Sequence, residues 1–362
     1  MLIASAGALN EEDDPVNSSP DVHLRAPRRP RRRRLATAAL LAAGAAFALA
    51  GCGPELGPIF KLRQLPGPQL PETSDPSTVV YGDHFYLYGS DNHLRAPVTR
   101  LTDIGRAYSL AEKNALTSEA MPTQPAWSAR ARQTWAPTVA AVGGRWLMMF
   151  SADRRNPPQP WNPQCIGRAW ADHPLGPFVP EAAPATCGIN GVGGALDPQF
   201  FRDPLTGQNW LLAAYGDTES PLHAMPIDEA GNLGAATPIL ARQHAWEYHF
   251  IENPAMVYDP VRGNYLLAYS AGRWWEPWYS TGIARCSTPA GPCTSDPSGP
   301  WIGASYGRTG PGGLSFVTDN VGSVYAVLST FAEGRESQQG GRAAAFMPLT
   351  LEPAVGLGPV VK

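Results

Sequence analysis

The sequence has little charge and little helical pattern. Charged residues are 16% of its 362 residues, the formal net charge is −3, and no basic patch follows residue 51. Nucleic-acid binding depends on clustered Lys and Arg that neutralise phosphates, so we expect no nucleic-acid partner. No stretch keeps a helical apolar period beyond about two turns. Apolar residues reach 43%, which is enough for a large core and excludes a mostly disordered chain.

Long hydrophobic runs are also scarce, and the Ala- and Leu-rich stretch from Leu35 to Ala50 has only 16 residues. A membrane-spanning helix needs about 20 apolar residues, so this stretch is short for a span. It follows the Arg-rich residues 28–34 and ends in Leu49-Ala50-Gly51-Cys52, which resembles a bacterial lipobox. We therefore predict a lipoprotein signal peptide over residues 1–51 and lipidation of Cys52. The protein would then be exported and anchored by lipid to the outer face of the cytoplasmic membrane.

An ordinary secretory signal peptide is the alternative, and it would release the protein instead of anchoring it. The arginines also permit export through a twin-arginine pathway. Residues 52–70 are rich in Pro and Gly and have no periodicity, so we interpret them as a tether. The folded domain is then predicted to cover residues 71–362.

Cysteine is rare, with five in the chain. Four remain after the lipobox, and an even number in an exported chain predicts disulfides. Neighbours in sequence form the simplest pairing, although three connectivities remain open. A zinc site is the alternative, but the spacings contain no C-x2-C pair. The pairs we expect are Cys165–Cys187 and Cys286–Cys293.

Glycine and proline are frequent, with 37 and 38 residues, and they separate many short apolar runs. These runs form hairpins that begin at spacings of 60, 62, 55 and 60 residues. A repeat of this length with three or four strands is typical of propeller blades. The sequence therefore predicts an all-β, five-bladed β-propeller, whereas the rival interpretation, two packed sandwiches, does not explain the even spacing. The predicted hairpin starts are Asp75, Trp135, Asp197, Glu252 and Gly312.

Three of these hairpins begin with a carboxylic acid. The innermost strands of a propeller begin near its axis, so Asp75, Asp197 and Glu252 are predicted to share one axial pocket. Crowded carboxyls cannot all ionise at their ordinary pKa values, so one should keep its proton. A protonated acid beside a carboxylate is what cleavage of a glycosidic bond requires. Glu247 is a rival acid, but it lacks the same position at a strand start.

Short motifs in a fixed order make the chain resemble glycoside hydrolase family 43 over about residues 71–350. Smaller pieces, Gly176-Pro177-Phe178 and Gly310-Pro311-Gly312, fall where that family has similar ones. The main motifs are Ser74-Asp75-Pro76-Ser77, Thr134-Trp135-Ala136-Pro137, Leu196-Asp197-Pro198-Gln199-Phe200-Phe201 and Ile251-Glu252-Asn253-Pro254.

The resemblance implies a five-bladed propeller that hydrolyses arabinose- or xylose-containing glycans with inversion. It also implies that Asp75 is the general base, Glu252 the general acid, and Asp197 the group that orients the acid and raises its pKa. Many members carry a His after the Gly-Pro-Gly piece that supports an axial Ca²⁺ or water network. This chain has Gly313 there, so we expect no metal and no other cofactor.

Aromatic residues are candidates for sugar-binding subsites, because flat apolar rings fit the C–H faces of sugars. Trp135 starts a blade, and Trp274 and Trp275 lie in a Pro-interrupted aromatic stretch that does not read as a plain strand. That stretch could instead be a hydrophobic plug between blades. Arg342, at a strand start of the fifth blade, is predicted to bind sugar hydroxyls. The expected partner is an oligo- or polysaccharide, and we expect a monomer.

Two other functions fit the same fold. A catalytically silent carbohydrate-binding propeller is supported in the sequence only by Gly313. An interaction scaffold unrelated to sugars would have no need for three acids at the axis. The sequence does not specify the sugar, the anomer, or exo against endo action.

Overall fold

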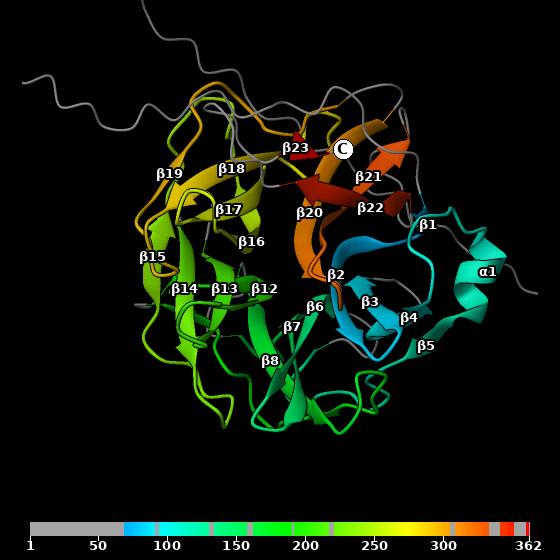
Figure 1. Cartoon of the computed structure of the whole chain (residues 1–362). Helices are drawn as coiled ribbons and strands as arrows, with labels where there is room; N and C mark the ends of the chain where they lie inside the picture. Colours follow the sequence, from blue (N-terminus) through cyan, green and yellow to red (C-terminus); the bar gives the residue numbers. More distant parts are fainter. Residues whose placement is uncertain are drawn as a thin grey trace, which may run out of the picture. The chain divides into compact units, whose positions relative to one another are not determined.

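The computed structural model describes residues 69–90, 94–129, 134–157, 162–189, 192–216, 221–304, 308–332, 341–350 and 360–361 (Figure 1). The predicted signal peptide and the predicted lipidation site at Cys52 lie outside the described residues. Of the predicted tether, residues 69 and 70 are described.

Five antiparallel sheets surround a central axis, as a five-bladed propeller requires (Figure 1). The first four are four-stranded meanders in which sequential strands pair, so each blade is a local unit. Blade 1 contains β2 (Ser74–Tyr81), β3 (His84–Ser90), β4 (Pro97–Leu101) and β5 (Thr117–Glu119). Blade 2 contains β6 (Trp135–Val142), β7 (Arg145–Asp153), β8 (Gln164–Ala171) and β9 (Val179–Pro180). Blade 3 contains β12 (Ala195–Arg202), β13 (Asn209–Tyr215), β14 (Leu222–Ile227) and β15 (Thr237–Leu240). Blade 4 contains β16 (Ile251–Asp259), β17 (Asn264–Ala271), β18 (Ser280–Cys286) and β19 (Cys293–Ser295).

Blade 5 joins the two ends of the domain. Its strands β20 (Arg308–Thr318), β21 (Val324–Ala332) and β22 (Arg342–Thr350) come from the C-terminal part of the chain, and β1 (Leu70–Pro71) pairs with β22. A short β23 (Val360–Val361) also pairs with β22. Leu70 is buried, so the last residue of the predicted tether belongs to the fold and helps to close the ring.

Smaller elements connect the blades. The strands β10 (Gly188–Ile189) and β11 (Val192–Gly193) form a two-stranded ribbon before blade 3. The helix α1 (Leu110–Ala115) is capped by Ser109 and Glu112, whose side chains each bond the other's backbone amide. No helix within the described ranges is long and apolar enough to cross a membrane.

The core is divided into five clusters, and each fills the seam between two neighbouring blades. Strand β13 illustrates the pattern, because Leu211 and Ala213 face blade 2 while Leu212 and Ala214 face blade 4. Both faces of such a strand are buried, which is why it reads as a continuous apolar run.

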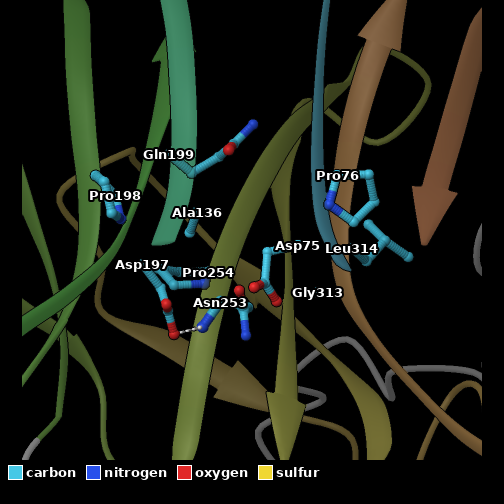
Figure 2. Close-up of a pocket in the computed structure, with 10 residues that line it drawn as sticks. All are labelled: Asp75, Pro76, Ala136, Asp197, Pro198, Gln199, Asn253, Pro254, Gly313 and Leu314. Carbon is cyan, nitrogen blue, oxygen red and sulfur yellow. Dashed lines mark hydrogen bonds between the residues drawn. The ribbon is translucent and has the colours of Figure 1, made fainter. Parts of the chain in front are cut away.

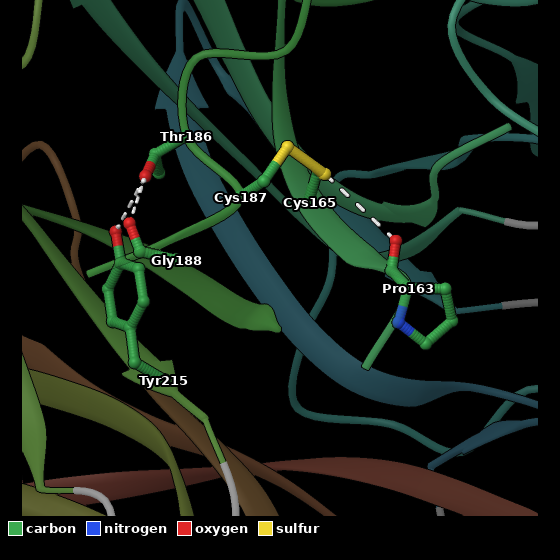
Figure 3. The surroundings of a disulfide bond; sticks show 6 residues. All are labelled: Pro163, Cys165, Thr186, Cys187, Gly188 and Tyr215. Atoms are coloured by element: carbon green, nitrogen blue, oxygen red, sulfur yellow. Dashed lines mark hydrogen bonds between the residues drawn. A yellow bond between two sulfur atoms is a disulfide. The ribbon is translucent and has the colours of Figure 1, made fainter. Parts of the chain in front are cut away.

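Two disulfides confirm the predicted pairing. Cys165 bonds Cys187 across 22 residues in blade 2 (Figure 3), and Cys286 bonds Cys293 between the paired strands β18 and β19. The residues around Cys187 also contact blade 3, because the Tyr215 hydroxyl donates to Thr186 Oγ1 at 3.5 Å. The first disulfide therefore fixes a connection that runs between two blades.

Candidate active site

A pocket opens on the axis where the five innermost strands converge (Figure 2). Each of these strands, β2, β6, β12, β16 and β20, has an irregular register near its start. A bulge of this kind bends a strand and redirects a side chain. The bulged residues supply most of the lining, which consists of Asp75, Pro76, Ala136, Asp197, Pro198, Gln199, Asn253, Pro254, Gly313 and Leu314.

One residue of each bulge adopts a left-handed backbone conformation, and these five residues are structural equivalents. They are Asp75, Ala136, Asp197, Asn253 and Gly313, with φ between 45° and 61°. Left-handed backbone is uncommon in residues other than glycine, and strained residues of this kind often gather at functional sites. The repetition in every blade shows that the strain here is also a property of the fold.

This register corrects one sequence prediction. Glu252 was expected to occupy the same strand position as the two aspartates, but Asn253 is their equivalent. Glu252 is one residue earlier and pairs with Ser270, as Ser74 pairs with Ser90 in blade 1. Successive residues of a strand point to opposite faces, so this shift gives Glu252 a different direction from the two aspartates.

Asp75 is half-buried and is held by a neighbouring serine. The Ser90 hydroxyl donates to Asp75 Oδ2 at 2.6 Å and accepts a bond from the Ala136 backbone N–H at 2.9 Å. Gly313 lies against Asp75, because a Cβ at Gly313 would be 3.0 Å from both Asp75 Cα and Oδ1. A side chain at position 313 would therefore compete with the Asp75 carboxylate for space.

Asp197 is more deeply buried, with 9% of its surface exposed. Its backbone N–H donates to Ser151 Oγ at 3.0 Å, and its Oδ2 accepts a bond from the Asn253 backbone N–H at 3.2 Å (Figure 2). In this view Asn253 lies between the carboxylates of Asp75 and Asp197. The Asp197 carboxylate is thus bonded directly to the strand that carries Glu252.

Glu252 is held by a tyrosine. The Tyr279 hydroxyl donates to Glu252 Oε1 at 2.7 Å, and it accepts a bond from Asn253 Nδ2 at 3.2 Å. Asn253 therefore bonds Asp197 through its backbone and Tyr279 through its side chain. The two carboxylates and the tyrosine form one hydrogen-bonded network.

Burial and mutual repulsion raise the pKa of two of the acids. Burial is the main cause of the raised pKa of Asp197, and the negative charges of Glu252 and Asp75 add to it. The pKa of Glu252 rises to about 7, chiefly through burial, with a hydrogen bond from Tyr279 opposing the rise and Asp75 supporting it. Near neutral pH the pair therefore retains a proton, as an acid–base site requires.

Arg342 is buried beside this network, with 6% of its surface exposed. Its guanidinium donates to the carbonyl oxygens of Gly310 and Ser329, each at 2.9 Å, and lies 5.4 Å from the centre of the Tyr279 ring. The positive charge lowers the pKa of Glu252 and partly balances the acids. The predicted contact between Arg342 and sugar hydroxyls remains a prediction.

The predicted aromatic positions lie in two places. Trp135 is half-buried and directly precedes Ala136 of the pocket lining. Trp274 and Trp275 are 46% and 39% exposed in the loop between β17 and β18, which does not fit the alternative of a plug between blades. Trp278 in the same loop is 62% exposed.

Glu276 organises this aromatic loop. It accepts bonds from the Tyr248 hydroxyl and from Trp278 Nε1, and it pairs with Arg273 at 3.1 Å. The loop also contacts the fifth blade, because Arg342 Nη1 donates to the Trp274 carbonyl at 3.4 Å. The exposed indoles are therefore carried on a segment with several polar anchors.

Glu247, the rival acid, is fully buried and has a structural role. One of its oxygens accepts bonds from the backbone N–H groups of Gln243 and His244, and the other accepts a bond from the Tyr269 hydroxyl. Neither Glu247 nor Glu252 lines the pocket, but Glu252 directly precedes Asn253 of the lining, and the charge of Asp75 acts on it. Glu252 therefore remains the candidate general acid.

The residues at the axis do not form a set of metal ligands. Within the described part of the chain, no group of three or more His, Cys, Asp and Glu side chains is placed to hold a metal ion. Gly313 contributes no side chain, and Asp75 and Asp197 are already engaged by Ser90 and Asn253. We therefore derive no catalytic step through a metal, and the expectation of no cofactor remains a prediction.

Four residues of the site escaped the sequence analysis: Ser90, Asn253, Tyr279 and Ala214. The sequence did contain a signal for Ser90, because a serine recurs near the end of the second strand in four blades. These serines are Ser90, Ser151, Ser270 and Ser329, and blade 3 has Ala214 instead. Tyr279 has no such signal, because its bond to Glu252 joins the end of the β17–β18 loop to the start of β16, 27 positions away.

Comparisons with known proteins agree with this fold and with these motifs. The sequence is 28% identical over 174 residues to the probable arabinan endo-1,5-alpha-L-arabinosidase D of Emericella nidulans. That match covers 43% of this chain and only 39% of the curated relative.

Two solved structures have a similar fold. A thermostable family-43 glycoside hydrolase superposes with a TM-score of 0.66 at 21% identity, covering 83% of this chain and 96% of that one. The Cellvibrio cellulosa alpha-L-arabinanase, solved with arabinohexaose, gives a TM-score of 0.62 at 17% identity, with coverage of 81% and 96%. The sequence profile of glycosyl hydrolases family 43 matches residues 70–353, which is most of the chain. The chain therefore belongs to the glycosyl hydrolases of family 43.

Proposed function

We propose that this protein hydrolyses glycosidic bonds in arabinose- or xylose-containing glycans and inverts the anomeric configuration. The observation that carries the proposal is the buried pair Asp197 and Glu252, whose raised pKa values keep a proton near Asp75. Asp75 and Asp197 line the axial pocket, and Glu252 directly precedes Asn253 of the same lining. An inverting glycosidase needs one protonated acid and one ionised base around the scissile bond.

Each acid has a distinct role in this proposal. Asp75 is the general base and removes a proton from the attacking water, while Ser90 holds its carboxylate in place. Glu252 is the general acid and gives its proton to the leaving oxygen, while Tyr279 fixes its orientation. Asp197 keeps negative charge close to Glu252 and so favours its protonated form. Inversion requires the carboxyls of Asp75 and Glu252 to be about 6.5–9.5 Å apart, which leaves room for the water.

The substrate class rests on family membership and on the aromatic residues. The relatives named above are an arabinosidase and an arabinanase, and an arabinofuranosidase from Lactobacillus brevis shares the fold with a TM-score of 0.64 at 16% identity. Trp135, near the acids, and Trp274 and Trp275, exposed in their loop, would stack against sugar rings. Replacing both loop tryptophans by Ala should then raise KM for polysaccharides and leave turnover of small aryl glycosides nearly unchanged.

A panel of substrates tests the function. The purified domain is incubated with aryl α-L-arabinofuranosides, aryl β-D-xylosides, arabinan and xylan, and the products are followed by proton NMR. Release of a sugar whose first-formed anomer is opposite to that of the substrate supports the proposal. Retention of configuration would contradict the assigned mechanism, and no hydrolysis of any of these substrates would contradict the function.

The second candidate is a silent carbohydrate-binding propeller, which in the sequence rests on Gly313 alone. The geometry weakens that support, because glycine suits the left-handed conformation at position 313 and leaves room for Asp75. Binding of arabinan or xylan without hydrolysis would favour this candidate over the first.

We also propose that the protein is exported and anchored through a lipid on Cys52. The support is the sequence Leu49-Ala50-Gly51-Cys52 after the short apolar stretch, together with two disulfides, which are typical of exported proteins. If Cys52→Ala still partitions with membranes as the unaltered protein does, the anchor is not on this residue.

A further inference from the structure

Three of the five seams between blades share one hydrogen bond at the axis. In each of them, a serine hydroxyl at the end of one blade's second strand accepts a bond from the backbone N–H of the left-handed residue in the next blade. The bonds run from Ala136 to Ser90 at 2.9 Å, from Asp197 to Ser151 at 3.0 Å, and from Gly313 to Ser270 at 2.9 Å. At the seam that closes the ring, Ser329 bonds within its own blade, to the Gly312 carbonyl at 3.3 Å.

The seam between blades 3 and 4 lacks this bond. Ala214 occupies the position of the serine, since it pairs with Leu196 as Ser90 pairs with Ser74. It has no hydroxyl to offer, and the Asn253 N–H is instead accepted by Asp197 Oδ2 at 3.2 Å. A candidate catalytic carboxylate therefore makes the bond that a structural hydroxyl makes elsewhere.

Blade 1 shows what a serine at position 214 would do. There the hydroxyl of Ser90 stands between the carboxylate and the next blade, donating to Asp75 and accepting from the Ala136 amide. Asp75 is thus separated from the neighbouring strand by one side chain, whereas Asp197 touches it directly. The strand that Asp197 touches carries Glu252, one residue before Asn253.

From this exception we infer that Ala214 is a positioning residue. Its lack of a hydroxyl makes Asp197 close the seam between blades 3 and 4 and fixes that carboxylate against the strand of Glu252. Asp197 then has two separable functions, a structural bond to Asn253 and an electrostatic effect on Glu252. The second of these rests on the proposed function, whereas the first does not.

Three variants separate the two functions: Asp197→Ala, Ala214→Ser, and the double variant. In the Asp197→Ala background, Ala214→Ser supplies the missing acceptor for the Asn253 N–H, and we expect the melting temperature to rise by roughly 2–4 °C. The same substitution in the unaltered protein has no unsatisfied amide to rescue, so it should raise the melting temperature by less. The double variant should remain as inactive as Asp197→Ala, because the carboxylate is still missing.

Two matched control variants are compared by the same change in melting temperature. Ala213→Ser places a hydroxyl one residue earlier, on the face of β13 toward blade 2, and it should not rescue Asp197→Ala. Ser151→Ala removes the hydroxyl that accepts the Asp197 N–H at the preceding seam, and it measures what one seam bond contributes. The structural part of the inference is overturned if Ala214→Ser raises the melting temperature equally in both backgrounds, or if Ala213→Ser does the same.

Kinetics test the positioning part. In the unaltered background, Ala214→Ser inserts a hydroxyl between Asp197 and the Asn253 amide, and kcat should fall while KM stays unchanged, since position 214 lies in the core. An unchanged kcat would overturn the positioning role. If the unaltered protein hydrolyses no glycoside, the proposed function fails, but the melting temperatures still decide the structural role.

Discussion

Blades 1 and 3 begin with the same dipeptide in the same backbone conformation, yet they place their aspartates in different surroundings. Asp75 and Asp197 each precede a proline, have φ of 45° and 53°, and occupy the same bulge of the innermost strand. Asp75 is half-buried and bonded by the Ser90 hydroxyl, whereas Asp197 is buried and bonded by a backbone amide of blade 4.

The difference shows how a repeated fold can assign different chemistry to equivalent residues. The backbone places both carboxyls at the axis, but the second strand of each blade decides what they touch. A serine in blade 1 bonds Asp75 within its own blade, and Asp75 stays partly exposed, as the proposed general base must be to contact water. An alanine in blade 3 lets Asp197 bond the strand of Glu252, where its charge would act on the proposed acid.

Replacing Asp75 should therefore have the largest effect. Asp75→Asn removes the base, and because every substrate needs an activated water, kcat should fall by about 10²–10⁴-fold for glycans and aryl glycosides alike. Initial rates on both kinds of substrate provide the measurement. If Asp197→Asn reduces kcat more than Asp75→Asn does, the roles given to the two blades are reversed.

Replacing Glu252 should have a large effect that depends on the leaving group. Glu252→Gln cannot donate a proton, so hydrolysis of natural glycans should fall on the order of 10²–10⁴-fold. Aryl glycosides with acidic phenols need little protonation and should be largely spared. A plot of rate against the pKa of the leaving group should be steeper for the variant, and equal losses on both substrates would show that Glu252 is not the acid.

The sequence was informative where contacts are local. Hairpins such as Asp75 to Ser90 pair residues close in sequence, so their alternation and turns predicted the five blades. The bond of Asn253 to Asp197 joins two blades across 56 positions, and that of Tyr279 to Glu252 spans 27 positions within blade 4, so no local pattern encodes either. The one-residue offset of Glu252 was missed because the bulge that creates it is visible only in the strand pairing.

Replacing Asp197 by an isosteric amide should have a smaller effect on rate and a clear effect on pH dependence. In Asp197→Asn the side-chain oxygen can still accept the Asn253 N–H, so the seam is kept and only the charge is lost. If Asp197 has the proposed role, loss of its negative charge should lower the pKa of Glu252.

The sign of this shift follows from the role of the acid. In the proposed mechanism Glu252 must be protonated, so the rate declines as pH rises through its pKa, and a lower pKa moves this basic limb to lower pH. The limbs belong to the coupled pair, so the whole profile of kcat/KM against pH should be compared. An unchanged basic limb would mean that Asp197 does not tune Glu252.

The smallest effect we predict is on stability, and it tests the same pair without any substrate. Burial raises the pKa values of Asp197 and Glu252 above their ordinary values of 3.8 and 4.5, so between the ordinary and the raised values the folded protein binds more protons than the unfolded chain. Stability contributed by these groups is therefore complete below about pH 4, and the part due to Glu252 is lost as pH rises through about 7. The melting temperature should decline from pH 5 to pH 8, and the decline should be shallower in Glu252→Gln and in Asp197→Asn.

Glu112→Gln is the control. Hydrogen bonds from Ser109 lower the pKa of Glu112, so loss of the Glu112 carboxylate cannot flatten the decline between pH 5 and pH 8. A decline of the same slope in Glu252→Gln, Asp197→Asn and the unaltered protein would mean that the axial pair does not hold its proton in the folded state.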